Sequence, residues 1–309
     1  MSATDLIQST RQRLGRVGVL LDTRLGGPLP PAGHQRQMLA RVEGMGYGSA
    51  WTNEAIGGKD VFVQLGIWLA ATERIVVGSG IANMWARPAR TMHGAAAVLP
   101  DGYPGRFVLG IGTGKAYQAA AVGLHYDRPL TQLRGYLDQM EASPLTIAPP
   151  PSVQYPRLLA GVGPKMLALA GERADGALPA AVPPEQIAAL REALGPDKLL
   201  IQMLAAVPDA DRQRARDTAR VIARAIVERA EEQYVRTFGQ LGFTEEQVTG
   251  LDDRVLDALV VHGDETLIAK RVGEYLDAGA DHVVISAPAA DLRAVTDHYE
   301  RLAPAVLAS

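Results

Sequence analysis

IVVGSGIANMWARPARTMHGAAAVLPDGYPGRFVLGIGTGK, residues 75–115, contains two short apolar runs separated by an alanine-rich amphipathic segment. The runs Ile75–Ile81 and Arg106–Ile111 end in glycine or polar residues, which is the pattern of buried strands. The segment between them predicts a helix that starts at Pro88, because proline fits the first helical turn. Parallel strands need such a helical crossover, so this stretch predicts a strand–helix–strand unit.

The same alternation continues on both sides of this unit. Further strands are predicted at Gly15–Asp22, Ser49–Asn53, Arg157–Gly161, Gly176–Ala181, Leu199–Val207 and Asp281–Ser286. The helices between and after them are predicted at His34–Gly46, Asp60–Thr72 with Asp60 as its N-cap, Thr131–Ala142, from Pro164, Pro184–Leu194, Glu265–Ala278 and Leu292–Leu302. Eight such units need about 250 residues and favour an α/β fold of the closed TIM type, a (βα)8 barrel. An open Rossmann sheet is disfavoured, because DTRLGGPLPPAG follows the first strand instead of GxGxxG.

Two stretches depart from the repeating unit. Ser143–Tyr155 contains four prolines and is interpreted as a surface connector. Asp209–Asp257 is charged and helical, and it is interpreted as an insertion between the seventh and eighth strands. The insertion is either a lid or subunit contact, or an ordinary pair of outer-layer helices. The chain 1–309 is expected to form one barrel domain.

Composition narrows the function classes. The 31 basic and 34 acidic residues give a net charge of −3, which argues against nucleic acid as the main partner. The chain has no cysteine, and its six histidines show no HxH or HxxxH spacing, so no metal site is predicted. No run approaches the ~18 apolar residues of a membrane helix, and the first residues lack the apolar core of a signal peptide. We therefore expect a cytoplasmic protein that acts on a small molecule, away from membranes.

The site of such a barrel lies at the C-terminal ends of its strands. The residues there are Asp22, Asn53, Glu54, Gly80, Ile81, Asn83, Gly112–Lys115 and Gly161–Pro164. GIGTGK (110–115) and AGVGPK (160–165) are informative, because glycine lets a ligand approach the backbone closely. AGVGPK also begins a helix, whose free N–H groups suit an anion. Each glycine alone is explained by a tight turn, but together they suggest a flat ligand across these strand ends.

These segments resemble the bacterial luciferase-like family of flavin and deazaflavin oxidoreductases. The most specific segment is Thr72–Ala116, with its GSG strand end, its RPA helix start and PGRFVLGIGTG. LLAGVGPKMLALAGERADGAL (158–178) and DAGADHVVI (277–285) are similar to later units of the family. GIGTGKA resembles the GVGTGEA of members that are predicted to use coenzyme F420.

The resemblance implies a tricyclic coenzyme at the barrel mouth, with F420 as the first choice and FMN as the alternative. It implies a cis peptide bond between Gly80 and Ile81, whose bulge contacts the ring. The residues expected to bind the coenzyme are Asn53, Gly80, Ile81, Gly112, Thr113, Gly114, Gly161, Val162, Gly163, Pro164 and Lys165. The coenzyme carries the hydride, while the protein orients it and excludes water. A homodimer through the helices after the second and third strands is also implied.

One position departs from the family. Many relatives have Asp-His or Glu-His after the second strand, whereas this chain has Glu54 and Ala55. Since Ala55 cannot transfer a proton, Glu54 is predicted to be the catalytic acid or base, provided that burial raises its pKa. The alternative for Glu54 is a helix cap or an ion pair. Lys115 and Gln118 replace the Glu and Asn of sugar-phosphate-oxidising relatives, which argues against that substrate.

Three functions remain open from the sequence. The first is hydride transfer between F420 and a small organic substrate, and the second is an FMN-dependent monooxygenase reaction. The third is a barrel that binds a flavin-like or phosphate ligand without turnover, which the missing histidine allows. Met84, Trp85 and Tyr117 near the strand ends suggest either a mouth for a hydrophobic molecule or ordinary packing.

Overall fold

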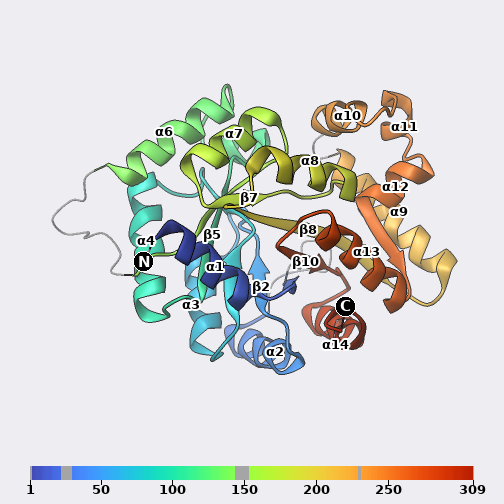
Figure 1. Ribbon diagram of the computed structural model, residues 1–309, viewed down its shortest axis with the longest axis horizontal. Helices are drawn as coiled ribbons and strands as arrows, with labels where there is room; N and C mark the ends of the chain where they lie inside the picture. Colours follow the sequence, from blue (N-terminus) through green and yellow to red (C-terminus); the bar gives the residue numbers. More distant parts are fainter. Residues whose placement is uncertain (1, 22–29, 143–152, 229–230, 309) are drawn as a thin grey trace.

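The computed structural model describes residues 2–21, 30–142, 153–228 and 231–308 (Figure 1). Its strands are β1 (Val17–Leu20), β2 (Ser49–Thr52), β3 (Val76–Ser79), β4 (Ala82–Asn83), β5 (Phe107–Gly112), β6 (Arg157–Ala160), β7 (Gly176–Leu178), β8 (Leu199–Pro208), β9 (Val260–Gly263) and β10 (His282–Ser286). Its helices are α1 (Ala3–Leu14), α2 (Ala32–Met45), α3 (Val61–Ala70), α4 (Ala89–Gly102), α5 (Ala116–Ala120), α6 (Pro129–Glu141), α7 (Pro164–Arg173), α8 (Pro184–Leu194), α9 (Arg212–Glu228), α10 (Glu231–Gly239), α11 (Glu245–Thr249), α12 (Asp253–Leu259), α13 (Glu265–Asp277) and α14 (Leu292–Val306).

The sheet closes on itself. Its order is β1-β2-β3-β5-β6-β7-β8, and β10 pairs in parallel with both β8 and β1. The register at the closure pairs Val17 with Val283 and His282 with Ile201. Helices follow the strands around the outside (Figure 1). This confirms the predicted eight-stranded TIM barrel, including Asp60, whose side chain accepts N–H bonds from Phe62 and Val63 as an N-cap.

The third predicted strand is not continuous. The expected strand Ile75–Ile81 ends at Ser79 as β3, and the chain resumes as β4, which pairs with the end of β5. The reason is a change of partner: β3 pairs with β5 only at Val77 and Gly78. The first predicted strand is observed as β1, and its expected end at Asp22 lies outside the described residues, as do residues 143–152 of the proline-rich connector.

Helix α1, which the sequence did not predict, covers one end of the barrel. Its side chains Ile7 and Leu14 belong to the same apolar cluster as the inward-facing Trp51 and Ile201. Figure 1 shows α1 crossing in front of the strands. Arg11 fixes it there, donating to Asp281 Oδ1 at 2.9 Å beside the start of β10 and to the carbonyl of Lys198. The N-terminal end of the barrel is therefore closed.

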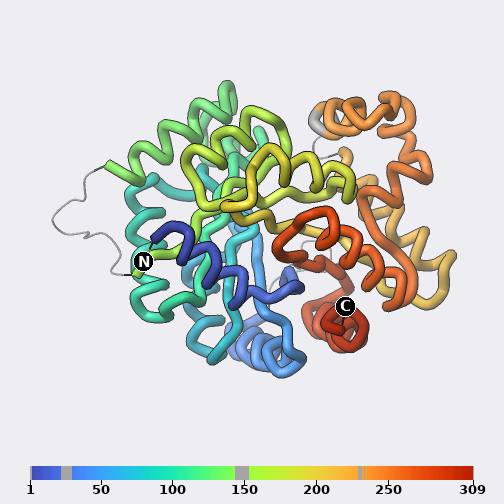
Figure 2. Tube along the Cα trace, viewed as in Figure 1, coloured from blue at the N-terminus to red at the C-terminus, as the bar shows by residue number. Residues whose placement is uncertain are grey.

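The region between β8 and β10 is helical, as predicted, but it also contains an unpredicted strand. Strand β9 pairs with the end of β8, from Ala205 and Val260 to Pro208 and Gly263. Helices α9–α12 pack on a second apolar cluster that includes Ile222, Phe238 and Leu256. Figure 2 shows α10 and α11 at one edge of the molecule. No helix within the described ranges is both long and apolar enough to cross a membrane.

A buried hydrogen-bond chain lies near the closed end of the barrel. The carbonyl of Gly15 can only accept, so His282 donates from Nδ1 to it at 2.9 Å. His282 Nε2 therefore accepts from the Ser49 hydroxyl at 2.7 Å, and Ser49 Oγ in turn accepts from Trp51 Nε1 at 2.6 Å. Burial lowers the pKa of His282 to about 4, so this imidazole is neutral at pH 7.

We expect this histidine to make the fold sensitive to acid. Between the ordinary His pKa of 6.5 and about 4, the unfolded chain binds a proton that folded His282 does not bind. The free energy of unfolding should therefore fall by about 2 kcal/mol more in the native chain than in His282→Gln between pH 7 and pH 5. Urea unfolding at both pH values measures this difference, and equal losses in the two proteins would contradict it.

Candidate functional site at the barrel mouth

The open end of the barrel has an apolar floor. Ile81, Ala160 and Met203 are partly buried and pack on the top of the interior cluster. Sequence reasoning missed Met203, although the alternation Leu199, Ile201 and Met203 in β8 could have indicated that it points inward. These three side chains come from β8, from β6 and from the segment between β3 and β4. The floor itself carries no acid, base or hydroxyl group.

Glycines allow the strand ends to meet at this floor. A Cβ on Gly112 would lie 2.6 Å from Ile81 Cδ1, and a Cβ on Gly80 would lie 3.1 Å from Met203 Cε. Neither position tolerates a side chain without movement of a floor residue. The glycines singled out from the sequence at these two positions therefore leave the ends of the Ile81 and Met203 side chains undisturbed.

The segment that joins β3 to β4 is held from both sides. The Gly80–Ile81 peptide bond is cis, as the family resemblance implies. Gly80 N donates to Thr52 O at 2.8 Å, and Glu54 N donates to Ile81 O at 3.0 Å. On the other side, Ser79 Oγ donates to Gly110 O at 2.9 Å and accepts from Gly110 N at 3.0 Å. The Ser79 side chain thus replaces strand pairing where β3 ends.

The loop after β5 is shaped by two aromatic side chains. Trp85 Nε1 donates to Thr113 O at 2.6 Å, and Tyr126 Oη donates to Gly114 O at 3.3 Å. Their ring centroids lie 6.0 Å apart. Gly114 has a φ of +54°, a conformation that suits glycine. Trp85 and Met84 are buried, so packing explains these two residues, whereas Tyr117 is 62% exposed beside the mouth.

The second glycine segment lies next to the first, because β5 and β6 pair at Ile111 and Leu159. Gly163 is the N-cap of α7, and Pro164 is its first residue. Gly163, Pro164 and Lys165 are exposed, while Gly161 and Val162 are half-buried. The structure thus brings the two predicted glycine segments together at one rim. Asn53 is half-buried just after the end of β2.

Glu54 is buried, and both of its carboxylate oxygens accept hydrogen bonds. Its Oε2 accepts from Asn83 N and from Arg87 Nη1, both at 2.9 Å. Its Oε1 accepts from Val61 N at 3.4 Å and from Arg87 Nη2. This is the ion pair that the sequence left as the alternative to a catalytic role. Proton transfer by Glu54 stays a prediction.

Lys115 is the cation that follows the glycine loop of β5. It is half-buried, and burial lowers the pKa of its ammonium group. Its backbone N–H donates to Gln118 Oε1 at 2.8 Å. Nearby, the amide nitrogen of Asn83 is buried without a hydrogen-bond partner, while its Oδ1 accepts from Trp85 N at 3.0 Å. In the part of the chain that the structure describes, no three His, Asp or Glu side chains gather as metal ligands.

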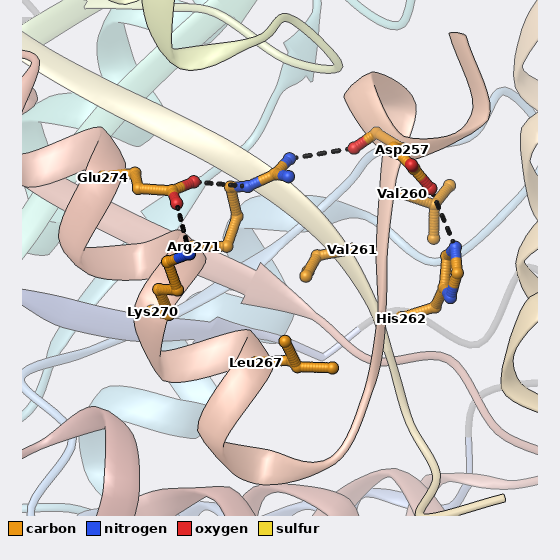
Figure 3. Close-up of a pocket in the computed structure, with 8 residues that line it drawn as sticks. All are labelled: Asp257, Val260, Val261, His262, Leu267, Lys270, Arg271 and Glu274. Carbon is orange, nitrogen blue, oxygen red and sulfur yellow. Dashed lines mark hydrogen bonds and ion pairs between the residues drawn. The ribbon is translucent and has the colours of Figure 1, made fainter. Parts of the chain in front are cut away.

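Two cavities lie elsewhere, between the insertion and its neighbouring helices. A cavity of about 240 Å³ is lined by α12, β9 and α13, and Figure 3 shows the residues around it. An adjoining one of about 520 Å³ is lined by α8, α12, α13 and the chain near Phe243. Arg271, which lines both, donates to Glu274 Oε2 and to Asp257 O, each at 2.8 Å. None of the predicted site residues lines either cavity, so the candidate site remains the barrel mouth.

Comparisons with known proteins agree with this geometry. Residues 15–282 match the luciferase-like monooxygenase family. A 5,10-methylenetetrahydromethanopterin reductase of Methanolobus tindarius is 25% identical over 287 residues, which cover 80% of this chain and 88% of the reductase.

Solved structures share the fold. An F420-dependent secondary alcohol dehydrogenase in complex with an F420–acetone adduct has a TM-score of 0.72 at 17% identity, covering 94% of this chain and 98% of the dehydrogenase. The monooxygenase RslO1 of Streptomyces bottropensis has a TM-score of 0.71 at 17% identity, covering 95% and 99% of the two chains. Since the family match spans most of the sequence, the chain belongs to the luciferase-like monooxygenase family.

Proposed function

We propose that this protein is an oxidoreductase that transfers a hydride between coenzyme F420 and a small organic substrate. The observation that carries the proposal is the apolar floor of Ile81, Ala160 and Met203 beside two adjacent glycine segments. Apolar floors with few polar groups suit planar ligands. A relative described as a putative coenzyme F420-dependent oxidoreductase and the F420-dependent secondary alcohol dehydrogenase support F420 as that ligand.

The residues at the mouth fit such a coenzyme. The floor offers a face for the tricyclic ring, Gly112–Gly114 offers backbone at its edge, and Asn53 is half-buried just after β2. The backbone N–H and the ammonium group of the exposed Lys165, in the first turn of α7, suit the phosphate of its side chain. When bound, the coenzyme supplies the hydride chemistry.

The chain's own contribution is to orient the reactants and exclude water. The apolar floor protects one face, and Trp85 and Tyr126 fix the neighbouring loop. Because the floor has no proton-transferring group, a proton has to come from the rim or from the substrate. At the rim, Lys115 has a lowered pKa through burial, and Glu54 is paired with Arg87.

The second candidate is an FMN-dependent monooxygenase. It is favoured by the fold likeness to RslO1, which is as close as that to the F420-dependent dehydrogenase. The third candidate, a barrel that binds such a ligand without turnover, is favoured by Ala55 at the family's histidine position.

Fluorescence titration of the purified protein with F420 and, separately, with FMN distinguishes these functions. We expect saturable micromolar binding of F420 and none of FMN. Binding of FMN alone would instead support the monooxygenase. Binding of F420 without turnover of any tested alcohol, imine or enone would support the non-catalytic barrel. Binding of neither F420 nor FMN would remove the first two functions and leave a barrel that binds another ligand without turnover.

Lys165→Glu should weaken F420 binding about tenfold, because it places a carboxylate beside the proposed phosphate position at the α7 N-terminus. Lys270→Glu is the matched control, since Lys270 is an exposed lysine on α13, with a side chain that is 74% exposed. The same titration measures both variants. Equal affinities in the two proteins would contradict the phosphate position.

We also propose a homodimer through α3 and α4. Helix α3 exposes Val63 and Ala70, and Val98 projects from the adjacent α4. Val63 is 64% and Val98 is 68% exposed, so this face leaves apolar area in water. Such a face is typical of a subunit interface.

Val63→Glu combined with Val98→Glu should convert the dimer to a monomer, because two carboxylates would be buried in the apolar interface. Val221→Glu is the control, since Val221 is also 68% exposed but lies on α9. Light scattering after size-exclusion chromatography measures the mass. A monomeric native chain, or a double variant that stays dimeric, would contradict this interface.

A further inference from the structure

We propose that Glu54 and Arg87 form a buried electrostatic latch that positions Ile81 in the floor of the barrel mouth. In this role Glu54 is a positioning residue and transfers no proton. The inference rests on the proposed function only for its coenzyme readout, because the latch itself is a property of the protein alone.

Glu54 holds the chain on both sides of Ala82. Its backbone N–H donates to Ile81 O at 3.0 Å, and its carboxylate accepts from Asn83 N at 2.9 Å. One residue at the end of β2 therefore fixes the backbone immediately after Ile81 through two hydrogen bonds. The second of these depends on the carboxylate, and the first does not.

Arg87 fixes that carboxylate in turn. Its guanidinium forms a two-pronged pair with Glu54, and it also donates to Asp60 Oδ2 at 2.8 Å. The Glu54 side chain is 3% exposed and that of Arg87 is 9% exposed, so solvent screens the pair weakly. The paired geometry is therefore rigid compared with surface ion pairs.

Neighbouring elements fix Arg87 as well. The Tyr136 hydroxyl on α6 donates to Arg87 O at 2.9 Å, and the guanidinium lies 4.9 Å from the ring centroid of Phe62 on α3. Burial disfavours the charged guanidinium, but the hydrogen bonds and charges of Glu54 and Asp60 outweigh it and raise the pKa of Arg87. Arg87 thus stays charged over the working pH range.

These contacts leave the Glu54 carboxylate little capacity for proton transfer. It accepts two backbone N–H groups and two guanidinium N–H groups, so both of its oxygens are occupied by hydrogen bonds within the protein. Its effect on the site passes through the backbone of Ile81–Asn83. Ile81 then completes the floor with Ala160 and Met203.

The test uses two variants. Glu54→Gln keeps the shape of the side chain but removes its charge, and Arg87→Lys keeps the positive charge but removes the two-pronged guanidinium group. The matched control is Arg134→Lys, which alters the exposed two-pronged pair with Glu172. Amide hydrogen exchange without coenzyme reports on the segment 81–85, and fluorescence titration reports F420 affinity. Both are measured well below the melting temperature of each variant.

We expect exchange in the segment 81–85 to be about tenfold faster in both latch variants, and F420 affinity to be about tenfold weaker, because a charge-assisted hydrogen bond to Asn83 N is weakened. The control should match the native chain in both measurements. The double variant Glu54→Gln/Arg87→Lys should lose less than the sum of the single losses, since both changes disrupt one interaction. Arg87→Lys is the mildest change and keeps the test available if Glu54→Gln does not fold.

Unchanged exchange in the segment 81–85 would overturn the latch, even if the variants melt earlier. Glu54→Gln that keeps native exchange and affinity but loses turnover would also overturn it, and would assign Glu54 the proton-transfer role predicted from the sequence. If the native chain does not bind F420, the proposed function fails, and the exchange measurement alone decides on the latch.

Discussion

Parallel pairing of β10 with both β8 and β1 is the constraint on which the molecule depends. Once the sheet is closed, every strand must end at the same opening, and residues far apart in the sequence meet there. Ile81, Ala160 and Met203 share one floor for this reason. Closure also creates an interior that needs a cover at the opposite end, which α1 supplies with Ile7 and Leu14.

The parts of the fold that follow local rules could be predicted from the sequence. Pro184–Leu194 and Asp60 agree with the observed helix and cap, because periodicity and capping act over a few residues. Helix α1 and strand β9 were missed. Each gains its stability from distant partners, α1 from the barrel interior and β9 from the end of β8.

The candidate site was likewise only partly predictable from the sequence. The two glycine segments could be predicted, because each lies at the end of a predicted strand. The sequence did not identify Arg87 as the ion-pair partner of Glu54, because the two residues are 33 positions apart and share no recognisable motif. Only the folded chain shows that the start of α3, strand β4 and Arg87, just before α4, meet around one carboxylate. The alternation in β8 indicates that the Met203 side chain points into the barrel, but it does not indicate that Met203 lies at the mouth.

The insertion has its own apolar cluster, from Ile222 to Leu256, and joins the barrel through the short strand β9. Its packing therefore draws little on the side chains that fill the barrel interior. A related chain can lengthen, shorten or replace α9–α12 while the strand ladder stays intact. In evolutionary terms, this region is a module whose length and sequence can change independently of the mouth floor.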